Sequence, residues 1–231
     1  MTIRVVLVEP ESAGNIGAIA RSMKNFALSD LWIVNAKTPL TMEARALAMH
    51  GYDVLRSAKR VKTLNQALSN LNLIVGTSAI VAASRSNVTR IPITPLELGV
   101  RASSFRGNVG ILFGRESSGL TNKEIERCDL MVTVPANKSY NVLNVASAAS
   151  IIFYELFRTR TTRIGPPAAS GLVKMRLLAE YSKLVRSSGV QRHKRPLAQR
   201  AFRNVVSRSF ISRREASLLL GVFRRTVAKL I

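Results

Sequence analysis

Four segments of this chain combine glycines and small polar residues with a few charged side chains, as loops that hold a ligand often do. In the clearest of them, Gly114 and Gly119 bracket the four residues from Arg115 to Ser118. Such glycines allow a ligand to approach the backbone or allow a positive φ, although ordinary turn glycines have the same signature. Because the bracket directly follows an apolar run, we favour a functional loop. The four segments are Glu9 to Arg21, Gly76 to Ala79, Phe113 to Leu120 and Val134 to Ser147.

The common nucleotide-binding motifs are absent from these segments. The run from Gly14 to Gly17 lacks the third glycine of GxGxxG, and no GxxxxGK followed by Ser or Thr occurs in the chain. The glycine-rich acidic loop of the commonest methyltransferase fold is also missing after the first apolar run. A ligand bound by these segments therefore needs a different architecture.

Short apolar runs alternate with helix-like patterns before residue 160, which predicts an α/β domain with a parallel sheet and helices on both faces. In such a sheet the ligand lies outside the carboxyl ends of the strands, so we expect the candidate segments to gather there. The expected strands are Ile3 to Val8, Asp30 to Val34, Leu71 to Gly76, Val109 to Phe113 and Met131 to Val134, and the expected helices are Ile16 to Phe26, Met42 to His50, Thr63 to Leu71 and Asn144 to Phe157.

The chain changes character after residue 160. Thr161 to Gly171 contains two consecutive prolines and two glycines, which is the composition of a linker. Helical patterns follow at Leu172 to Ser187 and Pro196 to Ser209, and Ser212 to Glu215 fits a capping box that opens a final helix to Ile231. We expect a domain at 1–160, a linker at 161–171 and a small all-α extension at 172–231.

The net charge points to a polyanionic partner. The chain has 35 Lys and Arg against 13 Asp and Glu, a formal charge of +22. Residues 161–231 hold sixteen of the basic and only two of the acidic residues. A merely solvated surface usually mixes both signs, so we expect the extension to bind nucleic acid through phosphate contacts. Arg85 and Arg90 are further candidates for such contacts.

Several classes of protein are disfavoured. The longest apolar runs fall well short of the roughly 20 residues that a membrane span requires, and the N-terminus lacks the pattern of a signal peptide, so we expect a cytoplasmic protein. The single cysteine, Cys128, excludes an internal disulfide and is interpreted as structural. With His50 and His193 as the only histidines, the chain offers no zinc-type ligand cluster, and we expect no metal.

Three segments together resemble the ordered motifs of the SpoU branch of the SPOUT methyltransferases. They are NIGAIARSMKNFA at 15–27, NVGILFGRESSGL at 108–120 and VPANKSYNVLNVASAASI at 134–151. The resemblance covers residues 1 to about 158 and is closest to members that methylate a tRNA ribose at nucleotide 32 of the anticodon loop. It implies a trefoil knot in the C-terminal part of the α/β domain, S-adenosylmethionine (SAM) held there in a bent shape, and an obligate homodimer with active sites at its interface.

The resemblance assigns the cofactor site to backbone groups and mostly small side chains, which can surround an adenine and a ribose without blocking access. Many relatives have Ser-Leu-Asn where this chain has Val142 to Asn144, so one hydroxyl is missing, and Ser139 or Tyr140 is the candidate to replace it. The expected cofactor-binding residues are Thr77, Ser78, Ala79, Phe113, Gly114, Val134, Asn141, Val142, Leu143 and Ser147.

Arg21 matches the arginine that the family uses in catalysis. An arginine on an amphipathic helix is usually solvated or binds phosphate, and only the motif context favours a catalytic role. The family proposal makes Arg21 the base for the 2′-hydroxyl, but a guanidinium holds its proton too tightly to act readily as a base. We therefore expect Arg21 to position an RNA phosphate and to stabilise the negative charge that develops on the ribose oxygen.

The other residues that match catalytic positions leave alternatives open. Asn15 is expected at the N-cap of the first helix. Glu116 could order its loop, bind Arg21 across the dimer, or complement the sulfonium charge of SAM. Asn144 could cap the last helix of the domain, face the cofactor, or do both. Tyr140 could stack on the target nucleotide or belong to the core.

The resemblance predicts transfer of a methyl group from SAM to the ribose 2′-hydroxyl of a tRNA cytidine or uridine, an in-line displacement in which alignment of the two substrates does much of the work. Ribosomal RNA is the alternative substrate. A non-catalytic RNA-binding relative would be favoured by loss of Arg21, Asn15 or Asn144, and all three are present. A DNA-binding regulator built on the basic extension would leave the three motifs unexplained.

Overall fold

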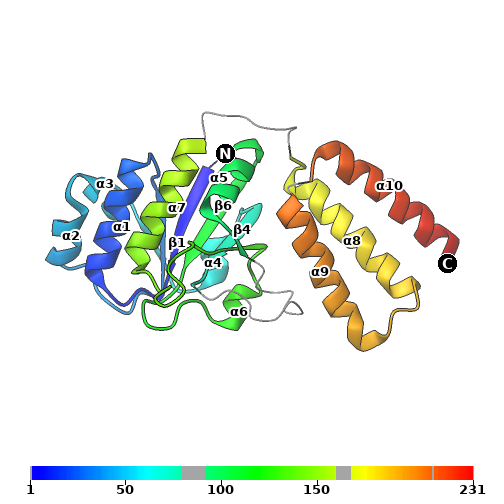
Figure 1. Ribbon diagram of the computed structural model, residues 1–231, viewed down its shortest axis with the longest axis horizontal. Helices are drawn as coiled ribbons and strands as arrows, with labels where there is room; N and C mark the ends of the chain where they lie inside the picture. The colour runs from blue at the N-terminus through cyan, green and yellow to red at the C-terminus, as the bar shows by residue number, and fades with distance from the viewer. Residues whose placement is uncertain (1, 80–91, 160–167, 210, 231) are drawn as a thin grey trace.

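The structure is a computed structural model that describes residues 2–79, 92–159, 168–209 and 211–230. Seven parallel strands form one sheet, which confirms the α/β expectation (Figure 1). The sheet has the order β3-β2-β1-β6-β4-β7-β5. The strands are β1 Thr2–Val8, β2 Asp30–Val34, β3 Lys59–Val61, β4 Leu73–Thr77, β5 Pro92–Ile93, β6 Asn108–Phe113 and β7 Leu130–Val132.

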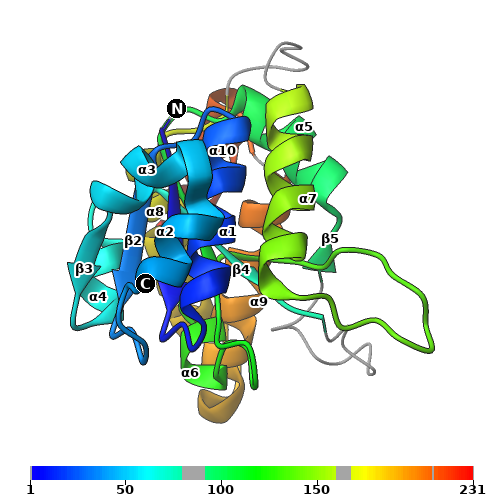
Figure 2. The same ribbon diagram turned by 90° about the vertical axis from the view of Figure 1, so that its left-hand side faces the viewer.

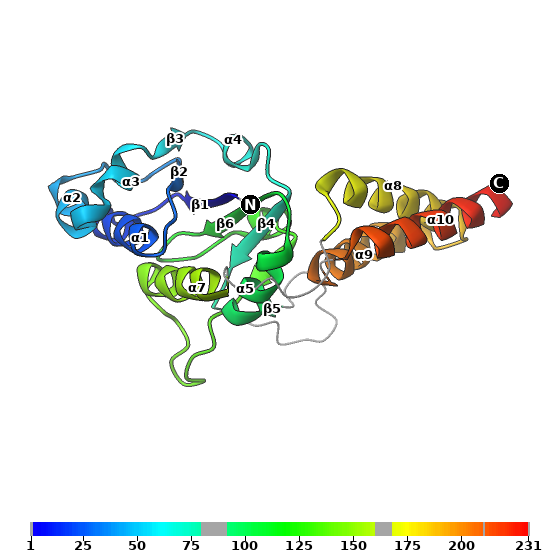
Figure 3. The same cartoon turned by 90° about the horizontal axis from the view of Figure 1, so that it is seen from above.

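Helices cover both faces of this sheet, as expected (Figure 3). The neighbours Leu112 and Phe113 of β6 point to opposite faces, because successive side chains of a strand alternate. Phe113 packs edge-on against Phe153 of α7, whereas Leu112 belongs to a second cluster with Ile125 of α6. The helices are α1 Ala13–Asn25, α2 Met42–Ala48, α3 Tyr52–Arg56, α4 Leu64–Leu68, α5 Pro95–Ser104, α6 Asn122–Ile125 and α7 Val145–Thr159, with a short 3₁₀ turn at Met49–Gly51.

The five expected strands occur within two residues of their predicted bounds, because each is a buried apolar run. The short strands β3 and β5 were missed, as were α3, α5 and α6. For α5 a signal was present in the sequence: Thr94 and Glu97 form a capping box, with Pro95 at the first helical position.

The first helix begins three residues earlier than predicted. Its N-cap is Ser12, whose hydroxyl accepts a hydrogen bond of 3.2 Å from the backbone N–H of Asn15. The prediction that Asn15 is the N-cap was therefore wrong. Both residues are good caps, and the apolar periodicity that begins at Ile16 favoured the nearer one. As a result, the Asn15 side chain lies on the first turn of α1 and is free to contact other segments.

The two helices α1 and α2 approach each other at glycine. A Cβ built on Gly17 would lie 2.1 Å from the backbone oxygen of Ala44, a distance that no side chain tolerates. The apolar side chains around this contact, Ile16, Ala20 and Ala48, are fully buried. Gly17 therefore sets the position of α1, on which one side of the candidate site depends.

The C-terminal extension forms three helices with a core of their own (Figure 1). Tyr181 stacks on Phe202 at a centroid distance of 4.0 Å, and Phe223 packs against both rings. The predicted capping box is confirmed: Ser212 and Glu215 exchange backbone-to-side-chain hydrogen bonds of 2.6 and 3.2 Å. The helices are α8 Gly171–Ser187, α9 Arg195–Ser209 and α10 Arg213–Leu230, with a 3₁₀ turn at Arg192–Lys194.

Part of the predicted linker, residues 161–167, lies outside the described residues, as do Arg85 and Arg90. The remainder is folded: Ala169 is buried and its N–H donates a hydrogen bond of 2.7 Å to the Ile211 carbonyl. The division of the chain at residue 160 stays a prediction, and so does the knot. Among the described helices, none is long and apolar enough to cross a membrane.

We expect Gly17→Ala to destabilise the protein by about 1–3 kcal/mol, because the new methyl group forces α1 and α2 apart. Urea unfolding measures the effect. Gly221→Ala is the matched control, since a Cβ at Gly221 in α10 meets no atom within 4 Å and alanine favours a helix. Equal stability of the Gly17 variant and the wild-type protein would contradict the packing described here.

Candidate active site

The four candidate segments meet at one edge of the sheet, as predicted. They follow β1, β6, β4 and β7, which are consecutive in the sheet, so their carboxyl ends stand side by side. The loop between β7 and α7 projects beyond the body of the domain at this edge (Figure 2). The sequence predicted that the segments gather at the carboxyl ends of the strands. The order of the strands comes from long-range pairing, which no local pattern encodes.

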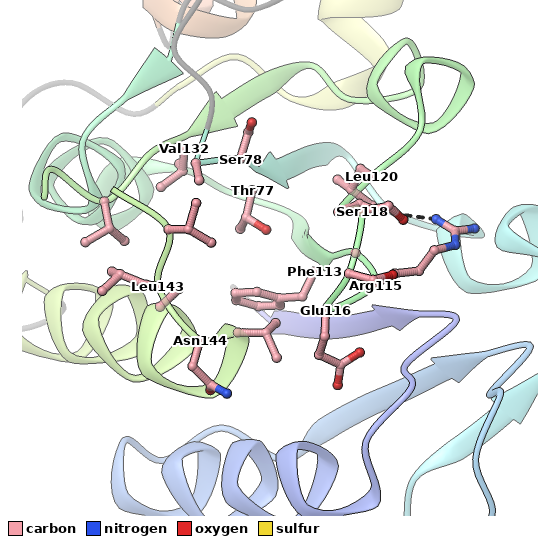
Figure 4. Close-up of a pocket in the computed structure, with 18 of the residues that line it drawn as sticks. Thr77, Ser78, Phe113, Arg115, Glu116, Ser118, Leu120, Val132, Leu143 and Asn144 are labelled. Atoms are coloured by element: carbon pink, nitrogen blue, oxygen red, sulfur yellow. Dashed lines mark hydrogen bonds between the residues drawn. The ribbon is translucent and has the colours of Figure 1, made fainter. Parts of the chain in front are cut away.

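A pocket of about 590 Å³ lies where these segments meet. Its size is typical of a site for a small molecule. Figure 4 shows Thr77, Ser78 and Val132 on one side of it and Leu143 and Asn144 on the other. Of the residues predicted to bind a cofactor or to act in catalysis, those that line the pocket are Asn15, Thr77, Ser78, Ala79, Phe113, Gly114, Glu116, Val134, Asn141, Val142, Leu143 and Asn144.

The carboxylate of Glu116 joins the loop after β6 to the start of α1. It accepts hydrogen bonds from the backbone N–H groups of Glu11 at 2.8 Å and Ser12 at 3.1 Å. It also accepts one from the side-chain amide of Asn15 at 3.0 Å. Hydrogen bonds to a charged acceptor are stronger than neutral ones. Of the three roles open to Glu116 from the sequence, the contacts of this chain place it in the first, the ordering of the loop.

A further hydrogen bond extends this connection to the last helix of the domain. The Asn144 side-chain N–H donates to the side-chain oxygen of Asn15 at 3.0 Å. The Asn144 side-chain oxygen accepts from the backbone N–H of Ala146 at 2.8 Å and so caps α7. Asn144 therefore caps the helix, lines the pocket and links Glu116 to α7 through Asn15. Its role toward the cofactor stays a prediction.

The turn from Gly114 to Gly119 is held from outside the pocket. Arg115 points away from the pocket and pairs with Glu124 at 3.0 Å and with Glu9 at 3.1 Å (Figure 4). The hydrogen bond to Glu124 raises the pKa of Arg115. Burial pushes the pKa of Glu124 upward, but the hydrogen bonds from Arg115 and Thr121 bring it below its ordinary value. This ion-paired arginine is part of the scaffold of the site.

Gly114 is required by the turn itself. A Cβ at Gly114 would lie 2.2 Å from the carbonyl carbon of Gly119. Gly119 itself has a φ of +69°, which favours glycine. Arg115 and Gly119 exchange two backbone hydrogen bonds across the turn. The glycine bracket is thus a tight turn whose inner surface lines the pocket.

Backbone-directed hydrogen bonds shape the opposite wall. The Thr77 hydroxyl donates to the Leu112 carbonyl at 2.9 Å, and the Thr133 hydroxyl donates to the Ser78 carbonyl at 2.8 Å. The Asn141 side chain reaches the Ala79 carbonyl at 3.3 Å, so it connects the loop after β7 to the end of β4. These contacts leave backbone and small side chains facing the pocket.

Sequence reasoning missed the apolar floor of the pocket. Val145, Ala148 and Ile152 of α7 line it at a spacing of three and four residues, which is one face of a helix. Leu120, Ile125 and Val132 complete it. The helical period was available in the sequence as a signal, whereas the contribution of Ile125 depends on how α6 packs.

Two predicted site residues lie outside the pocket. Arg21 and Ser147 are exposed, on α1 and α7 respectively. Tyr140 lines the mouth with its side chain 79% exposed, so the alternative that it belongs to the core was wrong. Ser139 is engaged with Asn137 within the loop, which leaves Tyr140 as the candidate for the missing hydroxyl.

Cys128 is buried beneath the pocket and, with Met131, occupies the space beside Gly76. Burial raises the pKa of its thiol to about 12. A thiol with such a pKa is not a nucleophile at neutral pH, which agrees with the structural role expected for it.

Comparison with known proteins places this geometry in context. Residues 2–154 match the family model described as the SpoU rRNA Methylase family. The tRNA (cytidine-2′-O-)-methyltransferase TrmJ of Methanocaldococcus jannaschii is 36% identical over 96% of this chain and 98% of its own length. The tRNA (cytidine/uridine-2′-O-)-methyltransferase TrmJ of Pectobacterium atrosepticum is 44% identical, over 67% of this chain and 63% of its own length.

Solved structures show the same arrangement. A probable methylase family protein from Haemophilus influenzae superposes with a TM-score of 0.72 and 27% identity, covering 99% of this chain and 97% of that one. The SpoU methyltransferase AviRb from Streptomyces viridochromogenes, solved in complex with the cofactor AdoMet, has a TM-score of 0.52 at 25% identity over 69% of this chain and 61% of its own.

Proposed function

This chain belongs to the SpoU rRNA Methylase family, and on that premise we propose that it is a SAM-dependent methyltransferase of tRNA ribose 2′-hydroxyl groups, acting at nucleotide 32 of the anticodon loop. The observation that carries the proposal is the chain of hydrogen bonds from Glu116 through Asn15 to Asn144, which joins the three motif segments around one pocket.

The pocket suits SAM in shape and charge. Its apolar floor and backbone-lined walls fit an adenine and a ribose. Glu116 is the acidic side chain among the residues that line it, and the charge of Arg115 is matched by Glu124 and Glu9. A carboxylate near a sulfonium cation is electrostatically favourable. The residues that would hold the cofactor are those from Thr77 to Ala79, Gly114 and the loop from Val134 to Leu143.

SAM supplies an electrophilic methyl group when bound. The ribose 2′-oxygen forms a bond to the methyl carbon as the bond from carbon to sulfur breaks, leaving S-adenosylhomocysteine and one proton. The protein contributes alignment, which does much of the work in such a displacement. Asn15, Glu116 and Asn144 fix the segments that align the two substrates, and Tyr140 at the mouth offers a ring on which the target base can stack.

We place Arg21 in the active site of a second copy of the chain. Its exposed side chain lies outside the pocket of its own chain. A partly exposed aromatic cluster at the end of α1 supports a homodimer: Tyr154 and Phe157 of α7 are 49% and 48% exposed and pack against Phe26. Figure 2 shows α1 and α7 side by side. Exposed apolar surface of this kind is typical of an interface. A composite site, in which the pocket of one copy is completed by Arg21 of the other, then explains why the motifs include an arginine that does not line the pocket of its own chain.

The extension supplies RNA contacts in this proposal. Arg186, Arg192 and Lys194 are exposed around the turn between α8 and α9. That turn lies at the same end of the molecule as α6, which borders the pocket (Figures 1 and 2). Phosphate contacts from these side chains position an RNA without reading its sequence.

A tRNA substrate is favoured over rRNA because relatives that match 96% and 100% of this chain, extension included, are named as tRNA enzymes. Both of these relatives are named for cytidine, and the bacterial relative that matches only the first part of the chain is named for cytidine and uridine. We therefore propose cytidine as the preferred base. A cytoplasmic location agrees with this substrate and stays a prediction.

Incubation of the full chain with labelled SAM and unmodified tRNA should give one methyl group per tRNA, at the ribose of nucleotide 32, because we propose a single target ribose. Mapping the modified nucleotide by mass spectrometry checks this. Purified rRNA is the matched control. Methylation of rRNA alone would assign the other substrate, and methylation of neither would leave the RNA-binding alternative.

Mixed dimers test the placement of Arg21. Arg21→Ala and Asn144→Ala proteins should each be inactive as homodimers. A heterodimer of the two should keep one intact site, because the wild-type Arg21 of one copy serves the wild-type Asn144 of the other. Co-expression with two affinity tags isolates the heterodimer for single-turnover assay.

A heterodimer with about half of the wild-type activity supports the composite site. An inactive heterodimer would mean that Arg21 acts within its own chain, because each copy would then carry one lesion in its own site.

A further inference from the structure

The C-terminal extension is docked on the α/β domain through arginines of α9. They contact the turn from Glu126 to Asp129, which connects α6 to β7. At the other end of α9, the Arg208 carbonyl accepts a hydrogen bond from Arg101 of α5. Lys174 of α8 lies 4.7 Å from the ring centre of Phe105. The extension is therefore attached to the domain at several points along its helices.

Arg200 binds three backbone carbonyls of the turn. Its guanidinium donates to Glu126 at 2.6 Å, Cys128 at 3.0 Å and Ile125 at 3.3 Å. These carbonyls follow the end of α6, where helical partners run out. Burial lowers the pKa of Arg200, which shows that its charge has been moved out of water to make these contacts. A planar guanidinium presents its N–H groups from separate nitrogens in a fixed fork, which suits it to bind several carbonyls at set positions.

Arg203 reaches the sheet through Asp129. It donates two hydrogen bonds, of 2.7 and 2.9 Å, to one oxygen of the Asp129 carboxylate. The other oxygen accepts the backbone N–H of Ile74 in β4 at 2.9 Å. The Asp129 backbone N–H donates to the Ile74 carbonyl at 2.7 Å, so both peptide groups around Ile74 are bound to Asp129. Arg203 thus neutralises a carboxylate that holds β4 beside β7.

The turn that these arginines hold joins α6 to β7, and one residue of each, Ile125 and Val132, lines the pocket. The side chain of Ile125 lines the pocket while its carbonyl binds Arg200. The side chain of Cys128 occupies the space beside Gly76, directly before Thr77 and Ser78, which line the pocket at the end of β4. Arg200 therefore binds a residue that lines the pocket, whereas Arg203 reaches the pocket less directly, through Asp129 and β4.

We propose that Arg200 and Arg203 are positioning residues for the cofactor pocket, through which the basic extension fixes the wall formed by Ile125 and by the end of β4. The proposal rests on the function proposed above and adds a second role for the extension. Two of its arginines serve the methyl-donor site, while exposed residues such as Arg192 remain for RNA. Removal of docking then weakens SAM binding even when no RNA is present.

Calorimetry with SAM and the full chain, without RNA, tests this role. Arg200→Ala should raise the Kd for SAM by about tenfold, because three hydrogen bonds from a charged donor are lost at the wall. Arg203→Gln should change the Kd in the same direction. The matched control is Arg192→Ala, which removes an equal charge from an exposed position in the same extension and should leave the Kd unchanged.

Two readouts separate positioning from loss of folded protein. Misfolding lowers the number of binding sites and kcat, whereas a misplaced wall raises the KM for SAM at nearly unchanged kcat. Free guanidinium at millimolar concentration should restore the affinity of Arg200→Ala and have no effect on Arg192→Ala.

A wild-type Kd in both Arg200→Ala and Arg203→Gln would overturn the positioning role and leave the proposed function intact. Absence of SAM binding in the wild-type chain would overturn the proposed function itself. If Arg200→Ala does not fold, Arg203→Gln and Arg200→Lys decide the question by the same measurement, since lysine keeps the charge but lacks the planar fork whose two nitrogens bind the carbonyls.

Discussion

The hydrogen bonds of the Glu116 carboxylate are the constraint on which the site depends. Three loops that leave different strands must be fixed relative to one another, and loops are ordinarily the mobile parts of a fold. Glu116 binds the backbone before α1 and the side chain of Asn15, and Asn15 binds Asn144 at the start of α7. Each hydrogen bond to the charged carboxylate contributes about 1.5–3 kcal/mol. The early start of α1 at Ala13 matters for the same reason, because it leaves the Asn15 side chain free for this connection.

The rest of the structure supports these loops from outside the pocket. Arg115 with its two glutamate partners closes the turn after β6, and the contact at Gly17 sets the position of α1. On the far side, Arg200 and Arg203 of the extension hold the turn before β7. The basic side chains of the extension thus fall into two groups. Some, such as Arg200 and Arg203, are half-buried and structural, and the exposed ones are available to an RNA. Charge alone would have assigned all of them to RNA.

Much of the fold could be predicted because its strands are buried apolar runs, and the three motifs identified most of the pocket. What failed depended on packing. Strands of two or three residues, β3 and β5, leave too short a pattern to recognise. The choice between Ser12 and Asn15 as the helix cap is decided by hydrogen bonds to a loop about 100 residues away. The place of Ile125 in the pocket depends on how α6 packs. The docking of Arg200 depends on backbone carbonyl groups, which every residue possesses and which therefore leave no signal in the sequence. The exposure of Arg21 is usual for an arginine on an amphipathic helix, whereas its proposed place in the site of a second chain has no local signal in the sequence.

A double-mutant cycle between Glu116 and Asn15 tests the role of the hydrogen-bonded connection most directly, with the Kd for SAM as the readout. Glu116→Gln and Asn15→Ala each break the link between the loop after β6 and α1. If that link positions the pocket, the double variant binds SAM about as well as the weaker single variant, with a coupling energy of about 1 kcal/mol or more. Strictly additive losses in the double variant would show that the two residues act separately, and would contradict a site held together through Glu116.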